Sequence, residues 1–364
     1  MTPEVIDPDG PERGTSANRR TISIAVCSVL LLGLLAVSTI LPVPYVVLRP
    51  GPTENTIGAL NGTDVIVIEG RETFPTDGNL NLTTVSVTSQ DRRMYLAEAL
   101  RAWLDPEDAV VPRGDIYPGD ETAEQVRTRN AEQMVTSQQS AVAAALRELD
   151  IPVAERVLVD SIVEGAPALG NLEAGDAILA VDGEEVATRD DVIRLITAHS
   201  PGDTVSFTVN RFDEQVEVEV ETVVSTDAGP TRAFVGFDPQ PGFDFPFDVE
   251  VTLGEEIGGP SAGLMFALGI VDKLTPGALT GGDFVAGTGT IAPAGEIGAI
   301  GGIQQKIAGA RDAGATTFLV PAPNCAAAVA AGVSGIRLVR VETLADAVDS
   351  LESLAAGGTA LPAC

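Results

Sequence analysis

One long apolar run opens the chain, and many short apolar segments follow it. The run over residues 22–41 carries no charged residue, and its length matches the roughly 20 apolar residues that a helix needs to cross a bilayer. Segments such as 64–68 and 78–87 are β-branched or alternate between apolar and polar positions, which favours strands. The spacing over 123–148 is helical. The pattern predicts a membrane-spanning helix followed by a mixed α and β fold.

The flanks of the apolar run indicate its orientation. Arg13, Arg19 and Arg20 precede it, and arginines collect on the cytoplasmic side of a span. The alternative is a cleaved signal peptide, although the run is long and no clear Ala-x-Ala site follows it. Both interpretations place the later domains outside the cytoplasm. We expect a disordered cytoplasmic tail over 1–20 and a single-pass transmembrane helix over 21–43.

Two patterns share the second half of the chain. Residues 149–223 form a compact set of strands, with a helix over 189–198 and turn dipeptides at Gly175-Asp176 and Asp182-Gly183. From residue 233 to residue 340, strands alternate with helices, which predicts an α/β sandwich. The strands at 64–87 have no partners nearby, so either they stand alone or they belong to this later sheet.

The candidate chemistry lies between residues 254 and 306. Ser261 follows two glycines and a proline and opens an apolar run, which reads as a tight turn into a helix with Pro260 in the first turn. The serine oxygen then lies beside free backbone N–H groups at the positive end of the helix. The backbone around Gly259, Pro260 and Ala262 is therefore a candidate for holding an oxyanion.

Lysines are scarce, and this narrows the choice of base. Only Lys273 and Lys306 are lysines among the 22 basic residues. Lys273 lies 12 residues beyond Ser261 on the same expected helix, about 18 Å along its axis, and cannot reach the serine. Lys306 lies on an expected helix over 302–313 and shares a face with Ile303, so it faces the apolar stripe. Burial lowers the pKa of a lysine, as a general base requires.

These residues resemble the proteolytic domain of Lon proteases. The matching motifs are Gly259-Pro260-Ser261-Ala262-Gly263, Thr288-Gly289 and Gly301-Gly302-Ile303-Gln304-Gln305-Lys306. The resemblance implies Ser261 as the nucleophile, Lys306 as its base and Thr288 as a hydroxyl that orients the lysine. It also suggests a homo-oligomer, because Lon-like domains are often ring hexamers. Two positions that are usually acidic in the family are Gly258 and Thr290 here.

Each residue also has an ordinary structural explanation. Ser261 could cap a helix, and Lys306 could extend its amine to water. The three motifs at the family's spacing favour the catalytic interpretation over these separate explanations.

Residues 149–223 resemble a PDZ domain of the kind associated with bacterial proteases. Such a domain adds a peptide as an extra strand in a groove between a strand and a helix. The resemblance implies that a peptide carboxylate would lie near Leu149, Asp150 and Ile151. Asp150 stands where the family usually has glycine, and its charge disfavours a carboxylate. The alternative is a PDZ fold that acts as a structural lid.

Composition excludes several classes of function. The formal net charge is −30, from 52 acidic and 22 basic residues, which argues against nucleic-acid binding and against adsorption to anionic lipid. No P-loop motif is present, so we expect no use of ATP. His199 is the only histidine, which excludes a His-rich zinc site. We expect neither a metal nor a cofactor.

The expected location of each cysteine indicates its redox environment. Cys27 lies within the apolar run and is expected to be a small packing residue. Cys325 and Cys364 lie in the oxidising part of the chain and could form a disulfide, or they could remain free thiols.

The order of span, PDZ pattern and Lon pattern resembles the membrane-anchored PDZ–Lon-like proteins. We expect an extracytoplasmic region over 44–128, a PDZ domain over 129–224 and a Lon-like proteolytic domain over 225–364. The resemblance implies an ATP-independent serine endopeptidase that cleaves extracytoplasmic or membrane-adjacent polypeptides, with the PDZ domain recruiting or regulating them. The alternative is a non-catalytic PDZ adaptor that holds a partner protein near the membrane.

Overall fold

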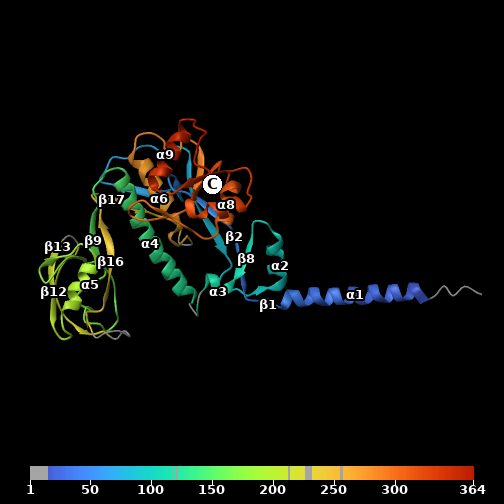
Figure 1. The fold of residues 1–364 in the computed structure, drawn as a ribbon, viewed down its shortest axis with the longest axis horizontal. Coiled ribbons are helices and arrows are strands. Elements are labelled where there is room, and N and C mark those ends of the chain that lie inside the picture. Colours follow the sequence, from blue (N-terminus) through green and yellow to red (C-terminus); the bar gives the residue numbers. More distant parts are fainter. Residues whose placement is uncertain (1–14, 118, 120–121, 212–213, 226–231, 255–256) are drawn as a thin grey trace, which may run out of the picture. The chain divides into compact units, whose positions relative to one another are not determined.

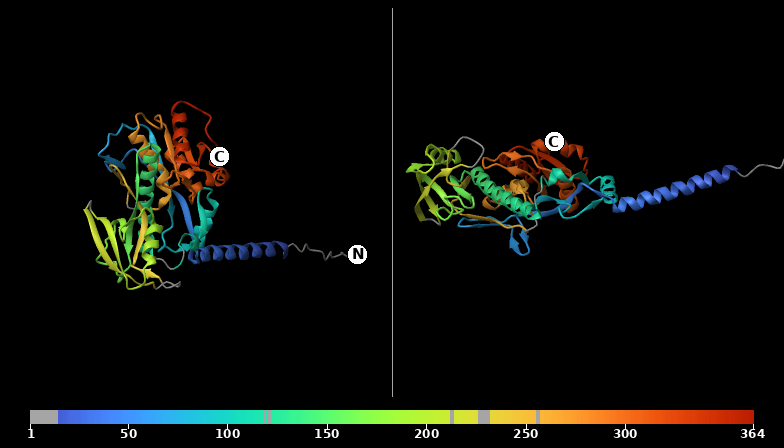
Figure 2. Two further views of the ribbon diagram at one scale, coloured as in Figure 1. Left: turned by 60° about the vertical axis from the view of Figure 1, so that its left-hand side comes forward. Right: turned by 90° about the horizontal axis from the view of Figure 1, so that it is seen from below.

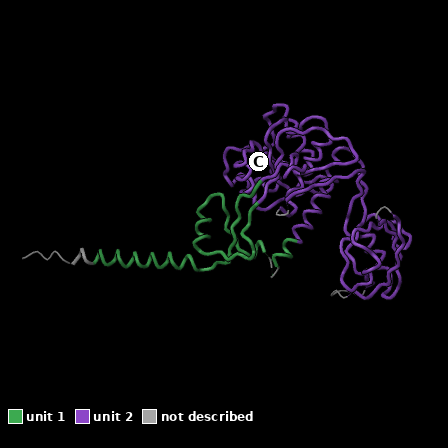
Figure 3. Tube along the Cα trace, turned by 180° about the vertical axis from the view of Figure 1, so that it is seen from behind, with its two compact units in different colours: residues 1–52, 85–127 green, residues 53–84, 128–364 purple. Residues whose placement is uncertain are grey.

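The chain forms two compact units in the computed structural model, and Figure 3 colours them separately. One unit contains residues 1–52 and 85–127, and the other contains residues 53–84 and 128–364. The structure describes residues 15–117, 119, 122–211, 214–225, 232–254 and 257–364. Most of the tail expected over 1–20 therefore lies outside the described residues.

Helix α1 (Thr15–Ile40) starts the first unit. It begins six residues earlier than expected, so residues 15–20 are helical, which corrects that part of the predicted disordered tail. Its segment Arg19–Ile40 is long enough, at 22 residues, to cross a membrane, and an 18-residue stretch of it has a mean hydropathy of 2.4. A signal sequence near an N-terminus has the same properties.

Short strands and one amphipathic helix complete the first unit. Strand β1 (Pro42–Val43) pairs antiparallel with β7 (Met94–Tyr95), and helix α2 (Leu96–Leu104) follows directly. The start of β2 (Tyr45–Asn55) pairs antiparallel with β8 (Ala109–Pro112). A small core holds the unit together, and helix α3 spans Arg113–Ile116. The buried members of that core are Val47, Met94, Ala99 and Ala102.

Parallel strands form the centre of the second unit. Strand β18 (Phe284–Gly287) pairs in parallel with β6 (Asn79–Val87) on one side and with β21 (Thr317–Pro321) on the other. Strand β22 (Arg337–Val341) pairs in parallel with β21. Strand β5 (Ile66–Glu69) pairs with β17 (Asp248–Val251). The strands that precede the PDZ pattern thus pair with strands that follow it.

Helices cover both faces of this sheet, as in an α/β sandwich. Val285 and Leu319 point into one core, and their neighbours Ala286 and Phe318 point into another, because successive strand residues face opposite sides. The first core also takes residues from α4, α6 and α9, and the second takes residues from α7 and α8. The helices are α4 (Ala123–Glu148), α6 (Gly263–Leu274), α7 (Ile303–Ala313), α8 (Cys325–Ala330) and α9 (Leu344–Ala355).

A second, antiparallel sheet forms the PDZ body, whose strands Figure 2 shows in green and yellow. Its strand order is β13-β12-β10-β9-β16, and β11 pairs with β10. Helix α5 (Arg189–Ala198) begins at Thr188, which forms a capping box with Asp191. The strands are β9 (Ala154–Ile162), β10 (Ala177–Val181), β11 (Glu184–Glu185), β12 (Thr204–Arg211), β13 (Glu214–Glu221) and β16 (Phe237–Asp244).

Packing places both boundaries of the PDZ body differently from the expected 129–224. Helix α4 contributes Ala141 and Leu146 to the core of the parallel sheet, so it packs with the parallel-sheet fold. Strand β16 pairs with β9 beyond residue 224 and brings Phe237 into the PDZ core. Both differences come from contacts between segments that are distant in sequence, which local patterns do not report.

Shorter elements complete the described fold. They are β3 (Ala59–Leu60), β4 (Thr63–Asp64), β14 (Val223–Val224), β15 (Ala233–Phe234), β19 (Thr290–Ile291), β20 (Ile297–Gly298) and the 3₁₀ turns Pro260–Ala262 and Ala322–Asn324.

Candidate active site

Ser261 lies in a 3₁₀ turn that leads directly into helix α6. The turn begins after Gly259, whose φ of 92° is accessible to glycine and strained for other residues. Pro260 takes the first position of the turn, where a missing N–H is no loss. Ser261 itself is half-buried, so its hydroxyl is fixed by the turn and still reachable by a substrate.

Lys306 reaches Ser261 from helix α7. The helix starts after Gly302, which adopts a left-handed conformation, and Lys306 lies in its first turn. The side chain of Lys306 is buried, with 3% of the residue exposed. Its Nζ lies 2.8 Å from Ser261 Oγ and 2.9 Å from Thr288 Oγ1. The structure therefore brings together the three side chains that the sequence singled out.

Thr288 lies in the break between β18 and β19 and is fully buried. Its hydroxyl donates to the carbonyl oxygen of Ser261 at 3.0 Å, while its oxygen accepts from Lys306 Nζ. The backbone of the serine turn is further tied to this break because Gly289 N donates to Ser261 O at 2.9 Å. Thr288 thus links the position of the amine to the position of the serine.

Burial lowers the pKa of the Lys306 amine from 10.5 to about 8. The cause is the loss of solvation of the charged form inside the protein. Both hydrogen-bond partners of Nζ are hydroxyl oxygens, so neither partner brings the negative charge that would restore the amine's usual pKa. A substantial fraction of the amine is therefore neutral at slightly alkaline pH, and a neutral amine can accept a proton.

The backbone near Ser261 differs in part from the expected oxyanion site. Gly259 N donates to the carbonyl oxygen of Asn130 at 3.1 Å, so this N–H is already used. Pro260 has no N–H, and its carbonyl oxygen accepts from the hydroxyl of Ser137 at 3.0 Å. Of the three residues expected there, only Ala262 keeps an N–H at the start of the helix, where backbone donors lack intrahelical partners.

Helix α4 supports the serine turn, a role that the sequence analysis did not assign to it. Ser137 is buried, and a Cβ on Gly263 would lie 2.8 Å from its Oγ. A Cβ on Gly258 would lie 3.0 Å from Cβ of Asn130. Glycine at both positions lets the helix approach the turn closely. The glycines themselves were the signal that a close neighbour was present.

A second unassigned residue, Asn324, holds the loop before α7. Its Oδ1 accepts from Ile300 N at 2.9 Å, and its Nδ2 donates to Ile300 O at 2.9 Å. Asn324 is buried, so this paired contact is shielded from water. It fixes the segment that leads through Gly302 into the helix of Lys306.

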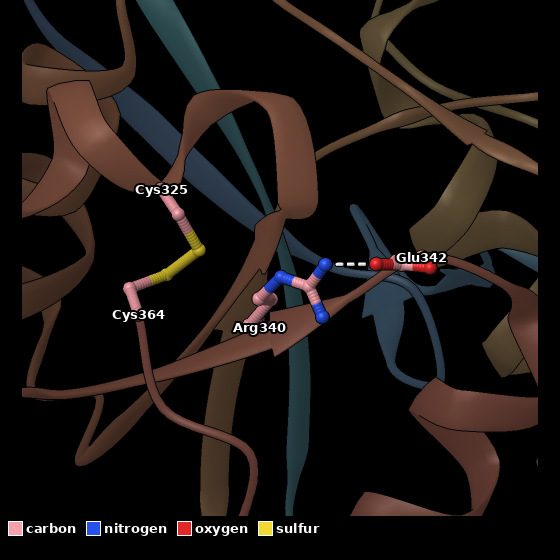
Figure 4. The surroundings of a disulfide bond; sticks show 4 residues. All are labelled: Cys325, Arg340, Glu342 and Cys364. Atoms are coloured by element: carbon pink, nitrogen blue, oxygen red, sulfur yellow. Dashed lines mark hydrogen bonds and ion pairs between the residues drawn. A yellow bond between two sulfur atoms is a disulfide. The ribbon is translucent and has the colours of Figure 1, made fainter.

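The cysteine directly after Asn324 forms a disulfide. Cys325, at the start of α8, is joined to Cys364 at the end of the chain, as Figure 4 shows. The same figure shows the ion pair between Arg340 and Glu342 at the end of β22. Cys27 is the free cysteine among the described residues and is exposed on α1.

The residues expected in a PDZ peptide groove are placed elsewhere. Ile151 is buried in the core of the proteolytic fold, and Leu149 packs against that core. Asp150 has a φ of 55°, the left-handed conformation that the usual glycine would adopt freely. Strand β9, which follows, pairs with β10 on one edge and with β16 on the other. These three residues therefore do not open onto a free strand edge, which corrects the expected groove.

The single histidine of the chain lies in the PDZ body. His199 Nε2 lies 2.6 Å from Asp182 Oδ2 within the PDZ body. Within the described residues, no cluster of three or more His, Cys, Asp or Glu side chains is arranged to hold a metal ion. The site is therefore built from one serine, one lysine and one threonine.

Comparisons with known protein families match two regions of the chain. The sequence model for the PDZ domain matches residues 126–222, and the one for the Lon protease C-terminal proteolytic domain matches residues 255–347. The chain is 28% identical to Lon protease 1 from Bacillus subtilis over 178 residues, which cover 48% of this chain and 22% of that protein.

Two further similarities cover shorter parts of the chain. The zinc metalloprotease RasP from Geobacillus kaustophilus is 31% identical over 85 residues, which cover 23% of this chain and 20% of that protein. The crystal structure of the PDZ domain of the SdrC-like protein from Listeria monocytogenes is 26% identical. It covers 23% of this chain and 86% of that chain, with a TM-score of 0.22. The chain thus spans about a fifth of the length of the two curated relatives.

Proposed function

We propose that this chain, which carries a PDZ domain and a Lon-type proteolytic domain, is an ATP-independent serine endopeptidase with a Ser–Lys dyad. One observation carries the proposal: the buried amine of Lys306 lies 2.8 Å from the hydroxyl of Ser261. A hydroxyl becomes a useful nucleophile when a neutral base stands within hydrogen-bond reach. Burial supplies the neutral base, because it brings the pKa of Lys306 to about 8.

In the first half of the reaction, Ser261 Oγ attacks the carbonyl carbon of a substrate peptide bond. Its proton passes to the neutral Nζ of Lys306 as the new C–O bond forms. The oxyanion of the tetrahedral intermediate is held by N–H groups at the start of the serine helix, including that of Ala262. The intermediate then collapses, the C–N bond breaks, and protonated Lys306 gives its proton to the leaving amine.

In the second half, water resolves the acyl-enzyme. Lys306, neutral again, takes a proton from the water while the water oxygen attacks the ester carbonyl carbon. The bond between that carbon and Ser261 Oγ then breaks, Lys306 gives the proton to Oγ, and the product acid leaves. Thr288 keeps the amine in place throughout, since its oxygen accepts one N–H and thereby directs the nitrogen lone pair toward Ser261. This role makes Thr288 a positioning residue.

Other parts of the chain support a proposed location and a proposed class of substrates. The apolar helix Arg19–Ile40 would anchor the protein in the membrane, with both domains outside the cytoplasm. The sequence has no P-loop motif, so substrates would have to be flexible or already unfolded polypeptides. We propose extracytoplasmic or membrane-adjacent polypeptides as substrates, with the PDZ domain recruiting or regulating them. By resemblance to Lon proteases, we also propose that the chain forms a homo-oligomer.

Hydrolysis of an unfolded protein by the purified full chain tests this proposal. We expect activity in the wild type and none in Ser261→Ala or Lys306→Ala. Between about pH 6.5 and 9.5, activity should rise with a midpoint near 8, because only the neutral amine accepts the proton. Equal hydrolysis by all three proteins would overturn the dyad. No hydrolysis by any of them, with full binding of the unfolded protein, would instead support a non-catalytic adaptor.

A further inference from the structure

Helix α2 of the first unit exposes an unusually apolar surface. Leu100 is 48% exposed, Trp103 72% and Leu104 75%. An adjacent side of the same helix packs into the small core through Ala99 and Ala102. The helix is therefore apolar on an exposed side as well as on its packed side. Contact between such an exposed apolar surface and water is unfavourable.

The exposed stripe continues into a hollow with the same character. The hollow has a volume of 340 Å³, and most of its lining is aliphatic or aromatic. It is lined by Val43, Tyr45, Leu96, Ala99, Leu100, Trp103 and Val110. Charged residues collect on the other side of α2, where Arg92 pairs with Glu98 at 2.9 Å. The helix therefore has a charged side at Glu98 and an apolar side at the hollow.

This surface begins where the apolar helix α1 ends. Leu96 N, at the start of α2, donates to the carbonyl oxygen of Leu41 at 3.0 Å, and Tyr95 pairs with Pro42 across β1 and β7. Figure 1 shows α2 next to this end of α1. The segment Arg19–Ile40 has 22 residues, a length of about 33 Å as a helix, close to the thickness of a bilayer's hydrocarbon core. Leu41 would therefore lie at the outer hydrocarbon boundary.

We propose that the exposed face of α2, together with its apolar hollow, is seated in the outer interface of the lipid bilayer. This inference rests on the membrane anchor in the proposed function. A second contact at the span's end would hold the first unit against the membrane surface.

Three observations identify lipid as the occupant. The surface is joined by a backbone hydrogen bond to the end of the span, so it starts at the depth where headgroups lie. Trp103, Tyr45 and Tyr95 are partly exposed there, and aromatic residues with a polar tip favour this layer. A formal net charge of −30 opposes attraction to anionic lipid, so the contact depends on apolar burial and should form on zwitterionic phosphatidylcholine.

Trp103 is the only tryptophan of the chain, so its fluorescence reports on this surface alone. The full chain is reconstituted into phosphatidylcholine vesicles, with and without bromine on the acyl chains. We expect bromine placed near the headgroup to quench most of the emission, and aqueous iodide to quench little. The double variant Leu100→Glu and Leu104→Glu should restore iodide access and lose most of the bromine quenching. Val329→Glu, which places the same charge at an exposed aliphatic residue of α8, should leave both unchanged.

The outcomes separate the anchor from the inference. If the chain is washed off the vesicles by alkaline carbonate, the anchor itself fails. If the chain stays with the vesicles but Trp103 is quenched by iodide and not by bromine, α2 faces water and the inference is wrong. If Trp103 is shielded from both quenchers, protein covers the surface, for example a second copy of the chain, and the inference is also overturned. Unchanged hydrolytic activity in the double variant shows that the fold is intact.

Discussion

Replacing Lys306 by methionine should abolish hydrolysis and, near neutral pH, stabilise the fold. Lys306 is buried, and burial lowers its pKa from 10.5 to about 8. At about 1.4 kcal/mol for each pKa unit, this corresponds to roughly 3 kcal/mol of folding free energy. Methionine has a similar length and no charge, so it removes the penalty while filling most of the same space.

The sign of the effect follows from proton binding. Below the folded-state pKa of about 8, the folded chain carries a buried charge and the whole penalty is present. Between about 8 and 10.5 the unfolded chain binds a proton that the folded chain has released, so the free energy of unfolding of the wild type rises with pH. The advantage of Lys306→Met is therefore largest near pH 7 and shrinks as pH rises through this window.

Urea unfolding followed by circular dichroism at several pH values measures this difference. The control is Ile307→Met, a change of similar size at the next, fully buried residue that introduces no titrating group. Its difference from the wild type should stay constant with pH. If the difference for Lys306→Met also stays constant between pH 7 and 10, the amine is not a buried group with a lowered pKa, and the reasoning about the base fails.

Three further changes test the support around the serine. Ser137→Ala removes the hydroxyl that donates to Pro260 O, and hydrolysis assays should show kcat reduced about tenfold with KM little changed, whereas Ser137→Cys should recover part of it. Gly263→Ala should lower thermal stability and activity because a Cβ would lie 2.8 Å from an oxygen atom, while Gly301→Ala, with open space around it, should not. Cys364→Ser removes a disulfide that joins residues 39 positions apart, and urea unfolding should show a free energy of unfolding about 2–4 kcal/mol below that of the oxidised wild type. Under reducing conditions the wild type loses the same bond, so the difference between the two proteins should disappear.

Local patterns predicted helices whose ends are marked by residues close in sequence. The expected helix over 189–198 coincides with α5, whose capping box is formed by residues close in sequence. The helix expected over 302–313 corresponds to α7 (Ile303–Ala313), because glycines mark both of its ends. The burial of Lys306 followed from its place on the apolar face of that helix.

Contacts between distant segments could not be predicted in the same way. The hydroxyl of Ser137 meets Pro260 across 123 positions of sequence, with the whole PDZ body inserted between them. Strand β16 pairs with β9, from Phe237 opposite Ile162 to Asp244 opposite Ala154. The local spacing of residues does not predict that register. The prediction of a groove near Leu149 was wrong for this reason, because the pairing of β9 with β16 could not be predicted from the order of elements along the chain.

The chemistry of the site explains why its support consists of hydroxyls and glycines. A carboxylate beside Lys306 would hold the amine in place, but its charge would raise the pKa of the amine and keep it protonated. Thr288 holds the same nitrogen through a neutral oxygen at 2.9 Å, so position is gained without charge. Glycine at position 263 then lets α4 and β19 pack closely against the serine turn, since a Cβ there would lie 2.8 Å from Ser137 Oγ and 2.9 Å from Cγ2 of Ile291. The lowered pKa, the two hydroxyl partners of Nζ and the close packing are thus three consequences of one requirement, an uncharged nitrogen beside Ser261.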